Sequence, residues 1–281
     1  MKYFIIVFSI FISASLFAQE IYTQKDVDVC KNTFEFAVEK NLSGKPINEI
    51  IIEIGKTFLG LDYIVHPIES DGEEKVIVNL SGFDCYTFLE TVLALSRNVK
   101  SGKTSFEDYL TEIENIRYRK GKNLGYTSRL HYFSDWIYES DRKKIIEDVT
   151  KKIGGEQYKN TVHFMSSNPG SYEQLKRNPK FIEEMKLVED VISNREYFYI
   201  PQNKIAVLEK GIQSGDIIGI TTDIKGLDIA HTGIAIRMED GRIHFMHSPM
   251  EGKKVQITEK PLSDYIKGNK RQTGIIVARP Q

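Results

Sequence analysis

One cysteine, Cys85, stands where a reactive thiol would be expected. It follows Asp84, which can cap a helix N-terminus, and later apolar residues such as Phe88 and Val92 recur at helical spacing. A thiol at a helix N-terminus faces unpaired backbone N–H groups and the positive end of the helix dipole, which favour the thiolate. The same N–H groups can stabilise an oxyanion formed at an attacked carbonyl. Because Cys85 is in phase with the apolar residues, it could instead be a core cysteine.

A histidine that could act as the base for this thiol lies in the last third of the chain. Strand alternation in one β-rich run places His231, Gly233 and Ala235 on a single face. Two such small residues let another backbone approach this face closely. The helix that carries the nucleophile would need such a close approach. In the next run His247 shares a face with Phe245, and a second imidazole there could hydrogen-bond the first and hold its tautomer. The pattern indicates a cysteine–histidine dyad oriented by His247, although each histidine alone could be a packed core residue.

A metal site and a serine nucleophile are the two rival kinds of chemistry. His231, His244 and His247 could be proposed as zinc ligands, but His244 and His247 fall on opposite faces of one strand, which is poor ligand geometry. The sequence has no Gly-x-Ser-x-Gly motif, so a serine hydrolase is weaker still. We therefore expect neither a metal nor an organic cofactor.

The first 18 residues have the layout of a secretory signal peptide. Lys2 supplies positive charge, Tyr3 to Phe17 is an apolar run, and Ala18 offers a small residue at a cleavage position. The run is shorter than the roughly 20 apolar residues of a membrane-spanning helix. We expect a periplasmic protein whose mature chain, residues 19–281, is a single domain without stable membrane insertion.

Composition and cysteine usage narrow the remaining possibilities. Lys and Arg number 38 against 39 Asp and Glu, a net charge of −1 that gives no electrostatic case for nucleic acid. An even cysteine count in an exported chain can indicate a disulfide, here between Cys30 and Cys85. The two cysteines lie in different contexts, so we expect a free thiol at Cys85, with the disulfide as the alternative. We also expect the protein to be a monomer.

The elements that must position these residues change character along the chain. Two amphipathic helices, 25–40 and 46–59, and two short strands, 63–68 and 75–80, are expected before the helix that starts at Cys85. A mixed stretch of about 103–200 follows, with helical patterns at 106–116, 132–137 and 181–192. Five β-rich runs, typical of an antiparallel meander, come last, at 216–221, 231–237, 242–247, 254–258 and 273–278. Helices followed by a meander predict an α+β fold, with the mixed stretch as an insertion.

Several short segments spread over the mature chain carry a family resemblance. They are Asn79–Cys85 (NLSGFDC), Ser128–Trp136 (SRLHYFSDW), Gly215–Ile218 (GDII), Gly226–Gly233 (GLDIAHTG), Phe245–Pro249 (FMHSP) and Pro261–Tyr265 (PLSDY). Jointly they resemble the NlpC/P60 superfamily of papain-like cell-wall cysteine peptidases, and within it the DUF1460 branch of N-acetylmuramoyl-L-alanine amidases.

The resemblance implies a papain-like α+β core in which Cys85 is the nucleophile, His231 the base and His247 the polar third residue. Tyr63 falls where related enzymes carry a tyrosine near the oxyanion. The implied substrate is a disaccharide-peptide fragment of peptidoglycan, preferably a 1,6-anhydro-muropeptide, cut between the muramic acid lactyl group and L-alanine. Tyr86 departs from the commonest pattern, in which a serine follows the cysteine, and is expected to shape the pocket.

The stretch of about 103–200 is expected to shape the substrate site. Several of its residues could stack on and hydrogen-bond a sugar, namely Tyr126, Arg129, His131, Tyr132, Asp135 and Trp136. Tyr63, Asp84 and Tyr86 complete the predicted substrate-binding set. Because Tyr132 and Trp136 also lie at helical spacing, packing in the core is the alternative for them.

Two other functions stay open on the sequence. One is an endopeptidase that cuts the γ-D-glutamyl–diaminopimelate bond within the stem peptide, and the other is a non-catalytic muropeptide-binding protein. The residues alone do not show whether the lactyl–L-alanine bond or the γ-D-glutamyl–diaminopimelate bond is cut. The family resemblance favours the lactyl–L-alanine bond. The presence of the cysteine with both histidines favours an enzyme.

Overall fold

The computed structural model describes residues 20–281, so the signal peptide predicted for residues 1–18 lies outside the described residues. The helices are α1 (Gln24–Glu39), α2 (Ile47–Lys56), α3 (Cys85–Ser101), α4 (Phe106–Arg117), α5 (Phe133–Arg142), α6 (Thr150–Ile153), α7 (Phe164–Ser167), α8 (Glu173–Arg177), α9 (Pro179–Ser193), α10 (Ile205–Leu208) and α11 (Leu262–Lys267). Of the helices in this part of the chain, none is long and apolar enough to cross a membrane.

The strands are β1 (Glu20–Ile21), β2 (Asp62–Tyr63), β3 (Val76–Ile77), β4 (Gly82–Phe83), β5 (Ile146–Asp148), β6 (Glu156–Tyr158), β7 (Tyr197–Pro201), β8 (Ile217–Thr222), β9 (Ile229–Arg237), β10 (Ile243–His247), β11 (Gln256–Ile257) and β12 (Gln272–Pro280). Short parallel pairs join β1 to β3 and β2 to β4. The other strands form one antiparallel sheet, so the fold is α+β as predicted.

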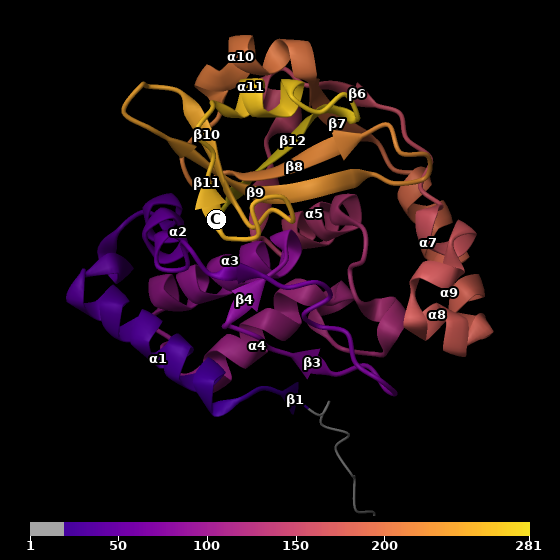
Figure 1. Ribbon diagram of the computed structural model, residues 1–281, viewed down its shortest axis with the longest axis horizontal. Coiled ribbons are helices and arrows are strands. Elements are labelled where there is room, and N and C mark those ends of the chain that lie inside the picture. The colour runs from indigo at the N-terminus through magenta and orange to yellow at the C-terminus, as the bar shows by residue number, and fades with distance from the viewer. Residues whose placement is uncertain (1–19) are drawn as a thin grey trace, which may run out of the picture.

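The antiparallel sheet lies above the long N-terminal helices in Figure 1. Its order is β11-β10-β9-β8-β12-β7-β6, with β5 paired to β12. The predicted meander holds for β8 to β11, which pair in chain order. The fifth predicted run does not continue it, because β12 returns to the other side of β8, where Ile275 pairs with Ile220. Strand periodicity identifies such a run but does not say which neighbour it pairs with.

Part of the predicted insertion belongs to this sheet. Strands β5, β6 and β7 come from the stretch of about 103–200 and extend the sheet beyond β12. Strands β5 and β6 have three residues each, which is too short for a periodicity signal. The same stretch also supplies α7, α8 and α9, which stand together at one side of the molecule (Figure 1).

Helix α3 is the central helix of the lower layer and carries the cysteine at its first position. Strand β4 leads directly into it, and Asp84 caps it by accepting hydrogen bonds from the backbone N–H groups of Tyr86 and Thr87 at 3.0 and 2.7 Å. Gly102 ends the helix in the left-handed region, with φ 70°. The sequence therefore located this helix start correctly.

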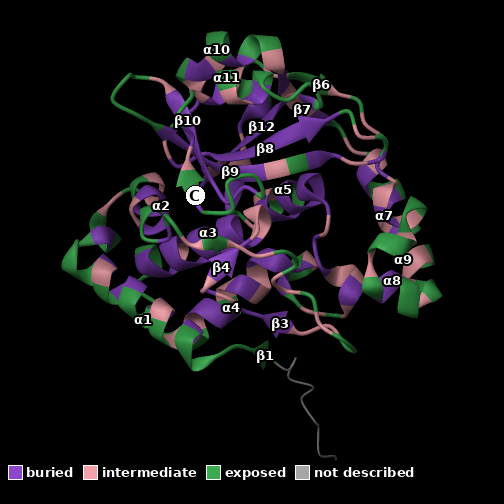
Figure 2. Ribbon diagram, viewed as in Figure 1, coloured by how far each residue is buried: buried purple, intermediate pink, exposed green. Residues whose placement is uncertain are grey.

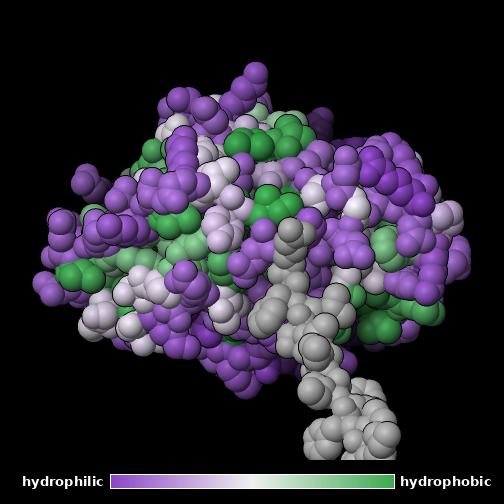
Figure 3. Space-filling model, turned by 90° about the horizontal axis from the view of Figure 1, so that it is seen from below, coloured by the Kyte–Doolittle hydropathy of each residue, from purple (hydrophilic) through white to green (hydrophobic). Residues whose placement is uncertain are grey.

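Two apolar layers hold the sheet in place. Below it, Ile234 of β9 packs in one cluster with Leu89 and Val92 of α3. Above it, Ile220 and other inward residues pack against α11. Figure 2 shows the buried strands and α3 enclosed by more exposed helices. The face seen in Figure 3 is mostly hydrophilic, with apolar patches interspersed. Apolar clusters therefore pack on both faces of the sheet next to the place where α3 meets β9.

Candidate active site

Cys85 lies where the helical layer meets the sheet. Helix α3 packs against β9, and the backbone N–H of Thr232, the residue after His231, is close enough to the thiol to act on its pKa. At the end of β10 the Ser248 hydroxyl donates a hydrogen bond to the Phe83 carbonyl at 2.8 Å. These contacts bring the first turn of α3 together with the strands that carry the two histidines.

The thiol of Cys85 is protonated at rest. Burial, with a smaller contribution from the Asp84 carboxylate, raises the pKa of Cys85 to about 12. Backbone N–H groups at the helix start and from Thr232 act in the opposite direction without outweighing burial. The sequence suggested a thiol pKa lowered by the helix N-terminus, and the structure corrects this because desolvation is the larger effect. Cys85 and Cys30 are both free thiols, so the alternative disulfide is not formed.

The two candidate histidines are brought together. His231 Nε2 lies 2.7 Å from His247 Nδ1, with the ring planes 73° apart. His247 is fully buried, and its Nε2 has no hydrogen-bond partner among the described residues. When His231 donates its Nε2–H to His247, the Nδ1 atom of His231 keeps a lone pair and can accept a proton. The contact occupies Nε2 of His231 and so leaves Nδ1 as the nitrogen that can act as a base in this tautomer.

Both imidazoles are neutral in this setting. Burial lowers the pKa of His231 to about 4. Burial, together with the charge that His231 would carry, lowers the pKa of His247 to about 2. A neutral imidazole is the state that a general base requires, so His231 can take a proton at any pH well above 4.

The space for His247 comes from Gly233. A Cβ atom at Gly233 would lie 2.6 Å from the Met246 carbonyl oxygen and 2.8 Å from both His247 Cβ and Phe245 Cε2. The small-residue face of β9 thus receives side chains of β10, whereas α3 packs on the opposite face, where Ile234 lies. The sequence predicted that the helix would approach the small face, which is wrong, because alternation identifies a face without naming the neighbour that fills it.

Tyr63 lies close enough to Cys85 for the charge of the thiolate to act on its pKa. Burial, with contributions from the charges that Cys85 and Asp84 would carry, raises the pKa of Tyr63 to about 12. The backbone N–H of Tyr63 donates to the Lys253 carbonyl at 2.7 Å, which ties β2 to the loop after β10. Its hydroxyl therefore remains protonated and able to donate near Cys85.

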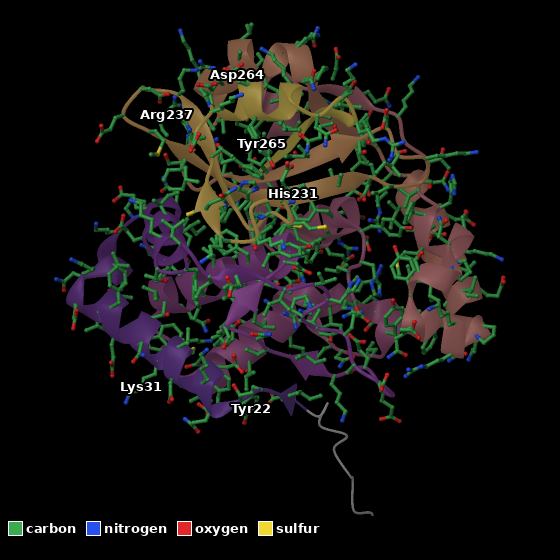
Figure 4. The ribbon with its side chains drawn as sticks, in the orientation of Figure 1. Tyr22, Lys31, His231, Arg237, Asp264 and Tyr265 are labelled. Carbon is green, nitrogen blue, oxygen red and sulfur yellow. The ribbon has the colours of Figure 1, made fainter. Side chains whose placement is uncertain are left out.

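A second tyrosine, Tyr265 of α11, was not among the predicted site residues. Its ring centroid lies 5.3 Å from that of His247. Its pKa is raised by burial first and then by the charges of Glu251 and Cys85. Figure 4 labels Tyr265 beneath α11 and His231 on the sheet. The only sequence signal for Tyr265 was its place in the PLSDY segment that carried the family resemblance.

Two adjoining cavities open beside the first turn of α3. The proximal cavity, of about 190 Å³, is lined by the predicted residues Asp84, Tyr86 and Arg129. The distal cavity, of about 360 Å³, is lined by Tyr126 and by residues of the segments 66–71 and 171–173. Both cavities are also lined by His66, Glu69 and His131, so we call them together the lateral groove.

The predicted residues of the proximal cavity are fixed by contacts of their own. The Tyr86 hydroxyl donates to the Leu130 carbonyl at 2.7 Å. Arg129 is buried, pairs with Glu69 at 2.6 Å and lies 3.5 Å from Glu74. These side chains therefore form rigid walls, and Arg129 holds the loop that carries Glu69.

Three other predicted substrate residues lie away from both cavities. Trp136 is fully buried, with its ring stacked on Phe133 at 5.1 Å. Asp135 is buried between Arg119 and Arg195, each at 2.5 Å. The Tyr132 hydroxyl donates to Glu189 at 2.7 Å and accepts from the backbone N–H of Met165 at 2.8 Å. The structure replaces the expected sugar contacts of Tyr132, Asp135 and Trp136 with packing and ion-pair roles, which was the alternative given by their helical spacing.

A larger cavity, of about 580 Å³, lies at β6, β7 and the turn between β8 and β9. Tyr199 and Lys159 are among its lining residues, and none of the predicted site residues is. Size alone would favour this cavity, but it lacks the thiol and the histidine pair, so we place the chemistry at α3. Within residues 20–281, no three His, Cys, Asp or Glu side chains are grouped so that they could hold a metal ion.

A family model and a solved structure identify the family of the chain. A family model described as AmiA-like, N-acetylmuramoyl-L-alanine amidase-like, matches residues 53–275. The chain is similar to the crystal structure of an N-acetylmuramoyl-L-alanine amidase from Bacteroides uniformis, with 37% identity, a TM-score of 0.80, and 84% of this chain and 99% of that chain covered. No curated protein matches the sequence.

Two further solved structures resemble the chain. A Bacteroides fragilis protein provisionally named a xylanase is 36% identical, with a TM-score of 0.74, over 80% of this chain and 98% of that chain. A Legionella pneumophila protein assigned to DUF1460 is 20% identical, with a TM-score of 0.67, over 92% of this chain and 95% of that chain. At that identity the likeness to the Legionella protein concerns the fold alone.

Proposed function

The chain belongs to the AmiA-like family of N-acetylmuramoyl-L-alanine amidase-like proteins, and we propose that it is a cysteine amidase of the papain-like NlpC/P60 kind. The proposed reaction is hydrolysis of the bond between the muramic acid lactyl group and L-alanine in disaccharide-peptide fragments, in particular 1,6-anhydro-muropeptides. The observation that carries the proposal is the 2.7 Å contact between His231 and His247, with the Cys85 thiol at the start of α3 close to the backbone N–H of Thr232, the residue after His231. The layout of residues 1–18 supports export to the periplasm as part of the same proposal.

Before the reaction, the Cys85 thiol and the His231 imidazole are both neutral. As the substrate carbonyl approaches, the Cys85 thiol proton moves to Nδ1 of His231, and the sulfur attacks the carbonyl carbon. His247 accepts the Nε2–H of His231 and so keeps the imidazolium oriented while it carries the extra proton. His231 then gives that proton to the leaving amine of L-alanine, which departs with the stem peptide. The lactyl carbonyl remains bound to the sulfur as a thioester.

Deacylation uses the same base in the same position. A water molecule loses a proton to Nδ1 of His231 and attacks the thioester carbonyl. The proton then returns to the departing sulfur, which restores the Cys85 thiol and releases a free lactyl carboxylic acid. Both steps pass through an oxyanion, for which the Tyr63 hydroxyl and the backbone N–H at the start of α3 are the donors that we propose. No step in this sequence uses a metal or an organic cofactor.

Removal of the nucleophile tests the enzyme against a binding protein. The Cys85→Ala variant should release no product from a defined disaccharide-tripeptide, whereas the Cys30→Ala variant, which removes a buried thiol of α1, should keep wild-type turnover. Wild-type protein that binds the fragment without turnover would support the non-catalytic alternative. Full activity in Cys85→Ala would end the cysteine mechanism.

Mass spectrometry of the products decides which bond is cut. Free disaccharide with an intact stem peptide is the result expected of the amidase. A disaccharide-dipeptide with free diaminopimelate would instead identify the endopeptidase. Cleavage within the disaccharide would identify a glycosidase and would overturn both readings.

A further inference from the structure

The lateral groove begins at the first turn of α3 and leads away from it. Its proximal cavity is lined by Asp84 and Tyr86, the two residues that flank Cys85. Its distal cavity reaches the start of α8, where Tyr172 lies. A substrate whose carbonyl sits at Cys85 would therefore extend one of its two sides into this groove.

We infer that the lateral groove binds the disaccharide of the substrate, with Tyr172 as the surface on which one sugar ring stacks. This inference rests on the proposed amidase function and adds where the sugar lies. The stem peptide then leaves the site on the other side of the cleaved bond.

The hydrogen-bond acceptors of the distal cavity favour a neutral polyol over a stem peptide. Its lining residues include Glu69, Asp71 and Glu173 and no lysine or arginine. The carboxylates of a stem peptide, like these side chains, only accept hydrogen bonds, so the two sets cannot pair with each other. Sugar hydroxyl groups instead donate hydrogen bonds, and carboxylate oxygens are acceptors without a competing proton.

Each of these carboxylates has a basic partner. Glu69 pairs with Arg129 at 2.6 Å, and Asp71 pairs with Arg177 at 2.5 Å. Glu173 pairs with Lys176 one turn further along α8. The partners offset the charge while leaving other lone pairs free, as suits recognition of hydroxyl groups.

Aromatic side chains give the distal cavity its apolar surface. Tyr172 is half-buried and lines the cavity. Tyr126, which lines it as well, is held between His131 at 4.4 Å and Phe181 at 5.8 Å, measured between ring centroids. A sugar ring has one face of C–H groups that packs on an aromatic ring while its hydroxyl groups reach polar neighbours. Because Tyr126 is only 2% exposed, Tyr172 is the tyrosine of this cavity whose ring has exposed surface for a sugar to contact.

The wall that completes the groove is fixed to its neighbours on two sides. The Gln174 amide donates to the carbonyls of Ser70 and Gly72 at 2.9 and 3.1 Å. On the other side, Arg129 donates to the Ile68 carbonyl at 3.3 Å. A wall anchored in this way loses little freedom when a ligand binds, which favours affinity. The volume of the distal cavity, about 360 Å³, lies in the range of small-molecule sites.

Two substrates and two matched tyrosines test the inference. The substrates are the disaccharide-tripeptide and a lactyl-tripeptide that lacks both sugars but keeps the same amide. The Tyr172→Ala variant should raise KM about tenfold for the disaccharide-tripeptide, with kcat unchanged, and leave the sugar-free substrate unaffected. Tyr172→Phe, which keeps the ring, should behave like the wild type. Tyr199→Ala removes a half-buried tyrosine from the separate 580 Å³ cavity and should change neither substrate.

A binding measurement separates this inference from the proposed function. Calorimetry should detect free disaccharide binding to Cys85→Ala protein and a loss of about tenfold or more when Tyr172→Ala is added. If that binding is seen while wild-type protein cuts nothing, the groove inference stands and the amidase proposal fails. The inference is overturned if Tyr172→Ala weakens both substrates equally, if disaccharide binding does not depend on Tyr172, or if Tyr199→Ala causes the loss instead.

Discussion

At the scale of single residues, the protons on Cys85 and His231 determine how the proposed reaction begins. Burial raises the pKa of the thiol to about 12 and lowers the pKa of the imidazole to about 4, so both groups are neutral between these values. A thiolate then arises only as the proton moves during attack. A protonated thiol is also oxidised more slowly than a thiolate.

The reactivity of the free thiol should reveal this neutral pair. Alkylation of wild-type protein by iodoacetamide is expected to be slow at pH 7 and to rise steadily toward high pH, as for a protonated thiol. Asp84→Asn should speed alkylation, because it removes a charge that raises the pKa of Cys85 while an amide still caps the helix. Fast alkylation that is flat between pH 5 and about 8 would instead indicate a thiolate–imidazolium pair, against this account.

The orienting role of His247 is a second prediction at this scale. His247→Gln should lower kcat by roughly 10²-fold with little change in KM, because the base would lose its fixed tautomer. His244→Gln is the matched control, since His244 belongs to the same strand but bonds Thr258 and Asp240. Steady-state kinetics at pH 7 would measure both variants. Equal losses in the two variants would mean that His247 contributes only to packing.

At the scale of elements, the sequence predicted what local patterns determine. Asp84 before an apolar helical repeat located the start of α3, and alternation located the strands that carry the histidines. Local patterns do not predict which strands pair, because β12 pairs with β8 through contacts between segments that are far apart in the sequence. The face of β9 that meets α3 was also misassigned, since Gly233 makes room for His247 and not for a helix.

That close approach gives a prediction at the element scale. Gly233→Ala should lower the free energy of unfolding by about 1–3 kcal/mol, because the added Cβ meets a backbone carbonyl that cannot move cheaply. Activity should fall further than stability, since β10 carries His247. Gly44→Ala has open space and should be nearly neutral. Chemical denaturation of both variants measures the difference, and unchanged stability in Gly233→Ala would contradict the observed packing.

At the scale of the whole molecule, the site is assembled from parts that the sequence could not place relative to one another. Helical spacing left Tyr132 and Trp136 as either core or sugar contacts, and only tertiary packing shows that they are core. No sequence pattern pointed to Tyr172, because its proposed contact with a sugar ring depends on the start of α8 lying beside the loop of residues 66–71. The proposed nucleophile and base were predicted from motif and periodicity, whereas the lateral groove could be recognised only from three-dimensional contacts.

Buried neutral histidines should make the folded protein sensitive to acid. His231 binds a proton near pH 4 when folded and near its ordinary value of 6.5 when unfolded, and His131 and His247 are shifted in the same direction. Between these pH values the unfolded chain binds more protons, so stability rises with pH and falls on acidification. Each unit of pKa difference is worth about 1.4 kcal/mol per histidine.

The free energy of unfolding is therefore expected to drop steeply as the pH is lowered from 6.5 toward 4. Urea titrations at several pH values measure it, with His231→Gln as the comparison. The variant should show a shallower dependence on pH because it removes one of these groups. A slope identical in the two proteins would mean that the pKa of His231 is the same in the folded and unfolded states, against the lowered value expected from its burial.

The most direct test of the central claim is to trap the covalent intermediate. Wild-type protein mixed with a disaccharide-tripeptide, quenched in acid within a fraction of the turnover time and digested, should yield a Cys85 peptide heavier by the muramoyl-disaccharide acyl group. That mass would identify the nucleophile and the bond together. A Cys85 adduct that contains L-alanine would move the cut into the stem peptide. Turnover with no adduct on Cys85 in wild-type protein, together with full activity in Cys85→Ala, would contradict the cysteine amidase account.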